Sequence, residues 1–303
     1  MNELSNFQFP LPPDPSVGVP PRCAANAVDL LLEARRDMTP PQWREFATTC
    51  FRAHPAFPFL CEEPCAAYSF RKPRGYAGDA VLLDLLYGGA SSAPLIQAAS
   101  ETGRELYRQT SRLPTPLAIR HRRDYLARRL GDLCTRGGRS RVLSVACGHL
   151  REAANLLERD TWPERLVALD QDARSLAVVQ KEYAGRAVEC LNMSALRLLS
   201  PRLDLGEFDF IYSAGLTDYL EDEFVERLIA ALARRLAPGG RLLICNMTPE
   251  TCGAAYMEAV MDWWLIYRTP AEMEKLAAST GLPWGVFVSQ DRHVVYLELR
   301  RGR

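Results

Sequence analysis

The sequence predicts an α/β protein in which a helical N-terminal part precedes a doubly wound, Rossmann-like sheet of seven strands. From about residue 25 to 136, apolar residues recur at three- and four-residue spacing, which is typical of helices. After Arg141, short apolar runs alternate with helical segments, a pattern that favours a parallel sheet. The last two runs are separated only by Gln290, Asp291 and Arg292, too few residues for a crossover helix. These two strands should therefore form an antiparallel hairpin at one edge of the sheet.

Three regions follow from this pattern. Residues 1–22 contain six prolines and are expected to form an extended arm. Residues 23–138 form the helical domain, with helices expected over 42–53 (after the Thr39 cap), 79–87, 92–112 and 116–136. Residues 139–303 form the sheet domain, with strands expected over 142–146, 165–170, 187–191, 208–213, 241–247, 284–289 and 293–299.

Composition excludes several classes of protein. The 303 residues include 37 Lys+Arg and 37 Asp+Glu, so the formal net charge is zero. The net charge therefore gives no indication of binding to nucleic acid or to anionic lipid. No apolar run approaches the roughly 18–20 residues that span a bilayer, and no signal peptide is visible. Nine scattered cysteines without a C-x-x-C pair indicate reduced thiols in a cytoplasmic protein. Four histidines at unsuitable spacings predict no metal site. Phosphate-loop, serine-hydrolase and zincin motifs are absent.

The expected ligand site lies where the first four strands end, because open α/β sheets bind ligands beyond the carboxyl ends of their strands. Asp170 follows Gly148 by 22 residues, the separation that places an acid under ribose hydroxyls. Gly148 permits close backbone approach, and a helix after it should point its N-terminus at the ligand. The remaining strand-end candidates for cofactor binding are Cys147, His149, Gln171, Asn192, Met193, Ser194, Ser213 and Ala214.

Over roughly residues 141–300 these features resemble the class I S-adenosylmethionine (SAM)-dependent methyltransferase fold. VLSVACG stands at its first motif, LVALD at its ribose acid, CLNMS at its adenine contact and LAPGGRLLI at its fifth strand. The resemblance implies SAM as cofactor. One departure is that Gly148-His149-Leu150-Arg151 replaces the usual G-x-G continuation. A dinucleotide oxidoreductase ranks below, since G-x-G-x-x-G is missing.

A narrower resemblance comes from RKPRGYAGDA (71–80) and SAGLTDYL (213–220). These are similar to a subfamily whose helical N-terminal domain covers the cofactor site. The subfamily includes carboxyl methyltransferases that make 3-hydroxy fatty acid methyl esters and azetidine-2-carboxylate synthases that cyclise SAM. The resemblance implies a lid and does not separate the two activities.

Several side chains have both a functional and a structural interpretation. Arg74 is a candidate partner for the cofactor carboxylate, or one of a solvated charge run. Tyr76 is expected to place its ring on the sulfonium or to pack the lid. Arg123 is chosen as the inward-facing arginine of a basic helix whose other charges face solvent. Asn192 and Asp218 are candidate catalytic residues. The structural alternative is a turn residue for Asn192 and a helix cap for Asp218.

The interpretation favoured here is intramolecular cyclisation of SAM to azetidine-2-carboxylate with release of methylthioadenosine. The alternative is O-methyl transfer to a carboxylate or hydroxyl of a small or fatty acid. No residue is placed as an evident base, which suits an acceptor carboxylate that is already ionised at neutral pH. The expected partner is a small molecule, without nucleic acid or membrane, and the oligomeric state is left open.

Overall fold

The computed structural model describes residues 18–135 and 140–303, which divide into two compact units. The first comprises the chain up to Arg120 together with residues 251–264, and the second comprises residues 121–250 and 265–303. The predicted arm falls largely on residues 1–17, and the predicted boundary at Gly137-Gly138 also lies outside the described residues.

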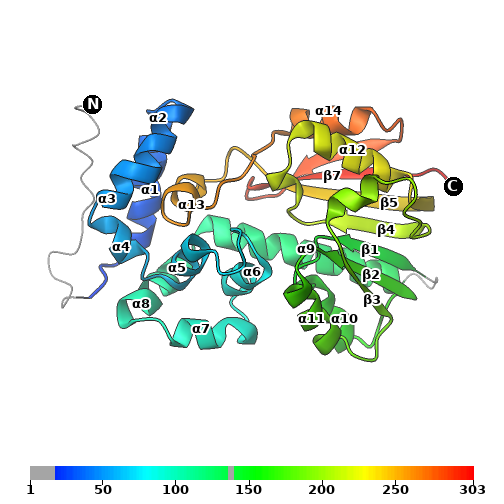
Figure 1. Cartoon of the computed structure of the whole chain (residues 1–303), viewed down its shortest axis with the longest axis horizontal. Coiled ribbons are helices and arrows are strands. Elements are labelled where there is room, and N and C mark those ends of the chain that lie inside the picture. The colour runs from blue at the N-terminus through cyan, green and yellow to red at the C-terminus, as the bar shows by residue number, and fades with distance from the viewer. Residues whose placement is uncertain (1–17, 136–139) are drawn as a thin grey trace. The chain divides into compact units, whose positions relative to one another are not determined.

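The first unit is helical throughout its described part (Figure 1). In chain order its elements are α1 (Cys23–Arg36), α2 (Pro40–Glu45), the π-helix η3 (Phe46–Cys50), α3 (Phe51–Ala53), α4 (Ala56–Leu60), α5 (Pro64–Arg71), α6 (Ala80–Tyr87), the 3-10 helix η4 (Ala90–Ser92), α7 (Ala93–Gln97), α8 (Glu101–Thr110) and, from the later segment, α13 (Ala254–Ala259). Helix α9 (Pro114–Thr135) begins in this unit and continues into the second.

Local capping chemistry explains where these helices start. The Asp79 carboxylate accepts hydrogen bonds from the backbone N–H groups of Val81 and Leu82 at 2.9 and 3.0 Å and so caps α6. Ser100 caps α8 in the same way, accepting from Gly103 N–H at 2.9 Å. The single helix predicted over 92–112 is therefore wrong. Because Ser100 begins a new helix, the stretch is broken into α7 and α8.

Residues 251–264 belong to the helical unit because a buried carboxylate ties them there. Glu258, in α13, is 3% exposed and accepts hydrogen bonds from the Arg35 guanidinium at 2.8 and 3.0 Å and from Trp43 Nε1 at 2.6 Å. A buried carboxylate is costly unless it is paired in this way. Sequence periodicity had placed this segment with the sheet, because its partners lie more than 200 positions earlier in the chain.

The second unit is a seven-stranded sheet with the strand order β3-β2-β1-β4-β5-β7-β6, which confirms the predicted α/β class (Figure 1). The strands are β1 (Arg141–Val145), β2 (Arg165–Asp170), β3 (Val188–Asn192), β4 (Phe208–Ser213), β5 (Leu236–Met247), β6 (Trp284–Val288) and β7 (Val294–Arg300). Strands β1 to β5 run parallel, and β7 pairs antiparallel with both β5 and β6. The predicted edge hairpin is present.

Helices cover both faces of this sheet. Besides the C-terminal part of α9, they are η5 (Arg151–Ala153), α10 (Ala154–Glu158), α11 (Ala173–Glu182), η6 (Ala195–Leu199), η7 (Thr217–Tyr219), α12 (Asp222–Ala233) and α14 (Pro270–Ala278). One apolar core lies under η6, α12 and α14, and the other under α9, α10 and α11. Such burial on both faces explains why the parallel strands read as continuous apolar runs.

The predicted fifth strand begins at residue 241, whereas β5 begins at Leu236, so the Pro238-Gly239-Gly240 segment lies inside the strand. The β4–β5 register shifts between Phe208 and Phe210, so this segment is an irregularity in the ladder. A Cβ atom on Gly240 would lie 2.8 Å from the carbonyl oxygens of Ala237 and Phe208. Only glycine fits there without backbone movement.

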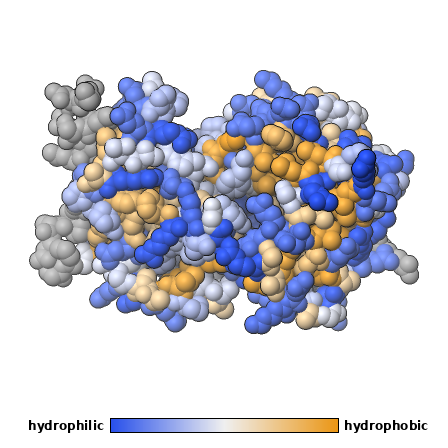
Figure 2. Space-filling model, viewed as in Figure 1, coloured by the Kyte–Doolittle hydropathy of each residue, from blue (hydrophilic) through white to orange (hydrophobic). Residues whose placement is uncertain are grey.

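Hydrophilic residues cover much of the surface in view, with hydrophobic residues gathered in patches between them (Figure 2). Across the described residues, no helix combines the length and apolarity needed to cross a membrane.

Candidate functional site

The candidate site is the set of loops that follow β1, β2, β3 and β4 in the second unit. From β1 the chain passes outward to β2 and then to β3. It next forms β4 on the other side of β1. Strand order therefore reverses beside β1, the place where open α/β sheets bind ligands. The strand ends are brought together as the sequence predicted.

The loop after β1 is held in an unusual backbone conformation. Ala146, Gly148 and Leu150 have φ angles of 55°, 54° and 54°, in the left-handed region that non-glycine residues seldom adopt. The loop is fixed by hydrogen bonds from Cys147 N–H to Leu169 O at 3.0 Å and from Leu150 N–H to Cys147 O at 2.9 Å. Local strain of this kind persists where the surroundings over-determine the backbone, and it is frequent at functional sites.

The side chains of this loop point into the protein. Cys147, His149 and Leu150 are all buried, and burial raises the pKa of the Cys147 thiol well above its usual range. A protonated, buried thiol is a poor nucleophile, so Cys147 contributes packing and backbone geometry. The 3-10 turn η5 follows the loop and leads directly into α10 at Ala154, so a helical segment follows Gly148 as predicted. Its role toward a ligand stays a prediction.

Asp170, at the end of β2, organises the adjacent loops. Its Oδ2 accepts a hydrogen bond from Gly148 N–H at 2.8 Å, and its Oδ1 accepts one from Asp172 N–H at 2.8 Å. The side chain is largely buried, and desolvation raises its pKa although both backbone donors act in the opposite direction. A carboxylate has about four lone-pair sites, so two remain for hydroxyl groups of a ligand. Gln171, the next residue, is exposed.

The end of β3 lies beside Asp170. The Asn192 side-chain amide donates to Asp170 O at 3.2 Å and to Gln171 O at 3.0 Å, which leaves its carbonyl oxygen to accept a hydrogen bond from a ligand amine. Met193 N–H donates to Asp170 O at 3.0 Å, and the Met193 side chain packs against the core under α12. Ser194 caps η6 by accepting from Leu196 N–H at 3.3 Å. The predicted roles of Asn192, Met193 and Ser194 toward a cofactor stay predictions.

The end of β4 brings charged groups into the interior. Ser213 Oγ donates to Val145 O at 3.0 Å and ties β4 to β1, and Ala214 packs against the core under α9. Asp218, 3% exposed, accepts from Met247 N–H at 2.7 Å. Burial raises the pKa of Asp218 to about 7, although the Arg122 guanidinium and this backbone N–H act to lower it. A carboxyl group with this pKa can accept or release a proton at neutral pH.

Arg122 is the inward-facing arginine of α9, and the prediction that chose Arg123 for that position is wrong. Arg122 is 5% exposed, and a Cβ atom placed on Gly215 would lie 3.3 Å from both Arg122 Nη1 and Asp218 Oδ2. Arg123 pairs instead with Asp124, at 2.7 Å between Nη2 and Oδ1. Adjacent residues on a helix point about 100° apart. The spacing of apolar residues did not identify which of the two neighbouring arginines faces the interior.

Glu152 is a second buried carboxyl group that sequence reasoning missed. It accepts a hydrogen bond from the Tyr212 hydroxyl at 2.6 Å. Burial raises the pKa of Glu152, and the bond from Tyr212 and the charge of Arg122 oppose that rise. Arg122 therefore acts on two buried acids, Asp218 and Glu152. The sequence signal was a glutamate only four residues after the strand-end glycine.

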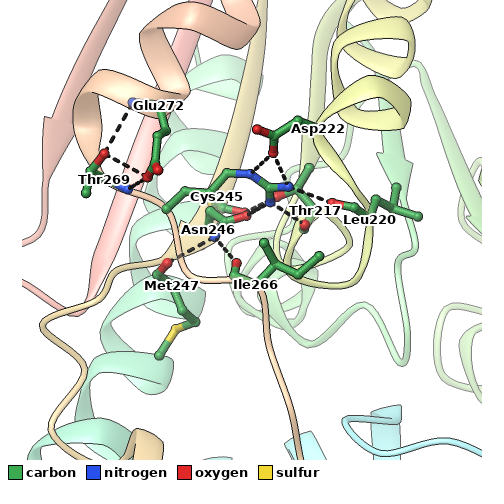
Figure 3. Close-up of polar contacts among 10 residues, drawn as sticks. Thr217, Leu220, Asp222, Cys245, Asn246, Met247, Ile266, Thr269 and Glu272 are labelled. Atoms are coloured by element: carbon green, nitrogen blue, oxygen red, sulfur yellow. Dashed lines mark hydrogen bonds and ion pairs between the residues drawn. The ribbon is translucent and has the colours of Figure 1, made fainter. Parts of the chain in front are cut away.

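Arg268 was also missed, and its hydrogen bonds hold the segment after β4 in place. Figure 3 shows the residues that accept these bonds, Thr217, Leu220, Asp222 and Asn246. Its guanidinium, 1% exposed, donates to Asn246 Oδ1 at 2.9 Å and to the carbonyl oxygens of Thr217 and Leu220, each at 2.6 Å. It also donates twice to Asp222 Oδ1, at 2.9 and 2.8 Å. These bonds fix the η7 turn that carries Asp218. A single arginine after an aromatic-rich stretch gave no pattern from which this role could be predicted.

Arg74 and Tyr76 lie in the first unit, in the segment between α5 and α6. Gly75 and Gly78, with φ of 91° and 77°, let the chain turn there. The Tyr68 hydroxyl donates to Asp79 Oδ2 at 3.1 Å. Burial is the main cause that raises the pKa of Tyr68 to about 12, and the Asp79 carboxylate adds to the rise. Arg74 acts on this pKa in the opposite direction. Arg74 therefore has a partner within its own unit, and the predicted roles of Arg74 and Tyr76 toward a cofactor stay predictions.

No group of three or more His, Cys, Asp or Glu side chains that could hold a metal ion occurs among the described residues.

The strand order and the strand ends that meet beside β1 define a doubly wound, Rossmann-like α/β fold. A family model described as a methyltransferase domain matches residues 142–240, which include the strand ends of β1 to β4. In the structure comparison, a protein of Bordetella parapertussis described as a possible exported protein aligns over 96% of this chain and 100% of its own, with a TM-score of 0.60 and 20% identity. That similarity shows a shared fold.

Two curated proteins are similar in sequence over part of the chain. An uncharacterised protein of Synechococcus sp. is 36% identical over 108 residues, 35% of this chain and 25% of that protein. The demethylmenaquinone methyltransferase of Thermus thermophilus is 32% identical over 128 residues, 42% of this chain and 56% of that enzyme. The chain thus spans about a quarter and about half of the lengths of these relatives.

Proposed function

We propose that this protein is a SAM-dependent enzyme that transfers a methyl group to an oxygen atom, either a carboxylate or a hydroxyl of a small or fatty acid. The observation that carries the proposal is the Asp170 carboxylate, which joins the ends of β1 and β2 through Gly148 N–H at 2.8 Å and keeps lone pairs for a further ligand. The methyltransferase-domain match over residues 142–240 supports the same cofactor.

The residues of the second unit fit SAM group by group. Asp170 would accept hydrogen bonds from the two ribose hydroxyls, and Asn192 Oδ1 would accept one from the adenine amine. The backbone at Gly148 has no side chain to obstruct the ligand. When bound, SAM supplies a sulfonium centre whose attached carbons are electrophilic.

The type of acceptor decides whether Asp218 is needed as a general base. A carboxylate acceptor is already ionised at neutral pH and needs no base. A hydroxyl acceptor must lose a proton, and Asp218, whose pKa burial raises to about 7, is the group suited to take it. Arg122, close to Asp218, would stabilise the negative charge on that carboxylate after a proton is released to solvent.

A second candidate reaction is the cyclisation of SAM to azetidine-2-carboxylate. Here the amine nitrogen of the substrate, once deprotonated, bonds to its γ-carbon while the carbon–sulfur bond breaks and methylthioadenosine leaves. The specific observation in its favour is the β1 loop, where buried His149 and Leu150 replace a glycine-rich turn. Because these side chains are buried, they would act through the backbone path of the loop, which would give the amino-acid arm the coiled, near-attack geometry that cyclisation needs. Asp218 is again the group suited to take the amine proton.

The helical unit is proposed to act as the lid of this site. Tyr76 would provide a ring face for the sulfonium, and Arg74 would pair with the amino-acid carboxylate. This assignment depends on the resemblance of residues 71–80 to the lidded subfamily.

Incubation with SAM followed by mass spectrometry tests the proposal. With SAM alone, the cyclase would produce methylthioadenosine and a four-membered cyclic amino acid in equal amounts above the spontaneous background. With SAM and a panel of carboxylic and hydroxy acids, the methyltransferase would produce S-adenosylhomocysteine and a product heavier by one methylene. Formation of neither product by a protein that binds SAM would contradict both reactions. The Asp170→Ala variant is the control for turnover at the strand-end site.

A further inference from the structure

The helical unit contains a cavity of its own that the proposed reaction does not use. The space among its lining residues amounts to about 600 Å³, a figure that includes solvent at the open side of the cavity. All of its lining residues belong to the first unit. The lining is mainly aliphatic, aromatic and thioether side chains, among them Val28, Leu86, Ile119, Met257, Met261 and Trp263.

The polar groups around this cavity are already satisfied by the protein. The Tyr107 hydroxyl donates to Leu85 O at 2.7 Å, and Thr115 Oγ1 accepts from Gly253 N–H at 3.0 Å. The Glu63 carboxyl group accepts from Ala66 N–H at 2.6 Å and from Thr110 Oγ1 at 3.2 Å. A cavity holds water only where several polar partners remain for it, so this one favours apolar contents.

The charged groups around the cavity indicate the charge of the ligand that it can bind. Among the described residues the lining includes no lysine, arginine or histidine, and the one carboxyl group in it is that of Glu63, which is 1% exposed. The Arg120 guanidinium behind the wall donates to Leu86 O at 2.8 Å and to Ser111 O at 2.6 Å, so an anionic ligand would meet a carboxyl group and a cation that is already engaged by backbone carbonyls. A cationic ligand would lose its hydration in an apolar chamber, a large cost for an ion. Two flexible methionines, Met257 and Met261, allow the wall to adapt to hydrocarbon of varying shape.

We propose that the helical unit binds a neutral, hydrocarbon-rich small molecule in this cavity, such as a medium-chain alcohol. Burial of its chain against these apolar walls provides the affinity, since each buried methylene contributes favourably. The inference does not rest on the proposed reaction with SAM, because every group it uses lies in the helical unit.

Titration calorimetry of the full chain with 1-octanol, octanoate and octylamine tests the ligand class. We expect saturable binding of 1-octanol with affinity at least tenfold above that of either ion. Glu63→Gln removes the ionisable carboxyl group while keeping a side-chain acceptor for Ala66 N–H, and should bring octanoate to within about threefold of the alcohol. Equal binding of the three ligands by the native protein, preference for an ion, or no saturable binding would overturn the proposal.

Location is tested by filling the cavity. Val28→Phe extends a lining side chain into the space and should weaken 1-octanol binding at least tenfold. The matched control is Leu95→Phe, at an exposed position of the same unit outside the lining, which should leave binding unchanged. Unaltered binding in Val28→Phe would place the ligand elsewhere.

A second readout does not depend on how well the filled variant folds. 8-Bromo-1-octanol should quench part of the tryptophan fluorescence of the native protein, because Trp263 lines the cavity. Trp263→Phe should lose that quenched component, whereas Trp284→Phe, at an exposed position in the sheet unit, should keep it. Equal quenching in both variants would contradict the location. SAM affinity, measured in parallel, reports on the strand-end site independently.

Discussion

The backbone N–H of Gly148 donates to the Asp170 carboxylate at 2.8 Å, although 22 residues separate them in sequence. This bond joins the ends of two parallel strands that pair residue for residue, from Arg141 with Arg165 to Val145 with Leu169. Because the second oxygen of Asp170 fixes Asp172 N–H, one carboxylate sets the shape of both loops. The ligand site is therefore shaped by a buried acid before any ligand binds.

Replacing Asp170 with alanine should weaken SAM binding about 10- to 100-fold, since hydrogen bonds to a charged group contribute about 1.5–3 kcal/mol. Titration calorimetry would measure this. Asp172→Ala is the matched control, because it keeps the backbone N–H that Asp170 binds and removes the cap of α11 together with the side-chain bonds from Arg174 and Ser175. Equal losses in the two variants would remove Asp170 from the binding site.

Replacing Arg268 with methionine should lower the free energy of unfolding by about 2–4 kcal/mol, because buried acceptors that lose a charged donor each cost about 1–3 kcal/mol. Thr217 O and Asn246 Oδ1 would each lose one donor, whereas the carboxylate of Asp222 is largely exposed and would be solvated. Urea denaturation is the measurement. Arg227→Met provides the control, because its pair with Glu223 is exposed on both sides and should change stability by less than about 0.5 kcal/mol. A loss below about 1 kcal/mol for Arg268→Met would contradict its role.

Asp218 should make the protein less stable as pH rises from about 4 to 7. Its pKa is raised from 3.8 to about 7 on folding, so within this window the folded state retains a proton that the unfolded state has released. The contribution is favourable at low pH and is lost progressively up to pH 7. In Asp218→Asn this dependence should disappear, so the variant gains stability relative to the native protein between pH 5 and 8.

Glu298 is the control for that series. Hydrogen bonding to Arg129 lowers the pKa of Glu298 against the effect of burial, so its contribution is present above about pH 4.5 and is lost only on acidification below that value. The stability difference between Glu298→Gln and the native protein should therefore be constant from pH 5 to 8. The two series would be measured by urea denaturation at each pH, and parallel curves for both variants would refute the assignment to Asp218.

Tyr76→Ala should lower turnover about 2- to 30-fold if the ring faces the sulfonium, since a cation–π contact contributes about 0.5–2 kcal/mol. Tyr76→Phe keeps the ring and should retain most of the activity. The ratio of the two turnover numbers, measured at saturating SAM, is the informative quantity. Equal effects of both substitutions would show that the hydroxyl matters and not the ring face.

Some features could be predicted from sequence because they depend on local pattern. The strands β2 and β4 have the predicted bounds, since each is a continuous apolar run buried on both faces. Asp170 and Gly148 were found because the length of a strand–helix–strand unit fixes their separation. In contrast, the predicted helix over 92–112 failed at Ser100, where a side-chain cap competes with helix continuation.

The α/β class, the seven strands and the loops that meet at their ends could all be predicted from the sequence. They follow from apolar periodicity and from the parallel arrangement of consecutive strands. Which charged groups enter the interior became evident only in the folded chain. Arg122 lies close to Asp218 and acts on Glu152, and Glu258 ties residues 251–264 to the helical unit, through partners distant in sequence. A charge can be buried only where such partners converge, and that convergence is a property of the folded chain.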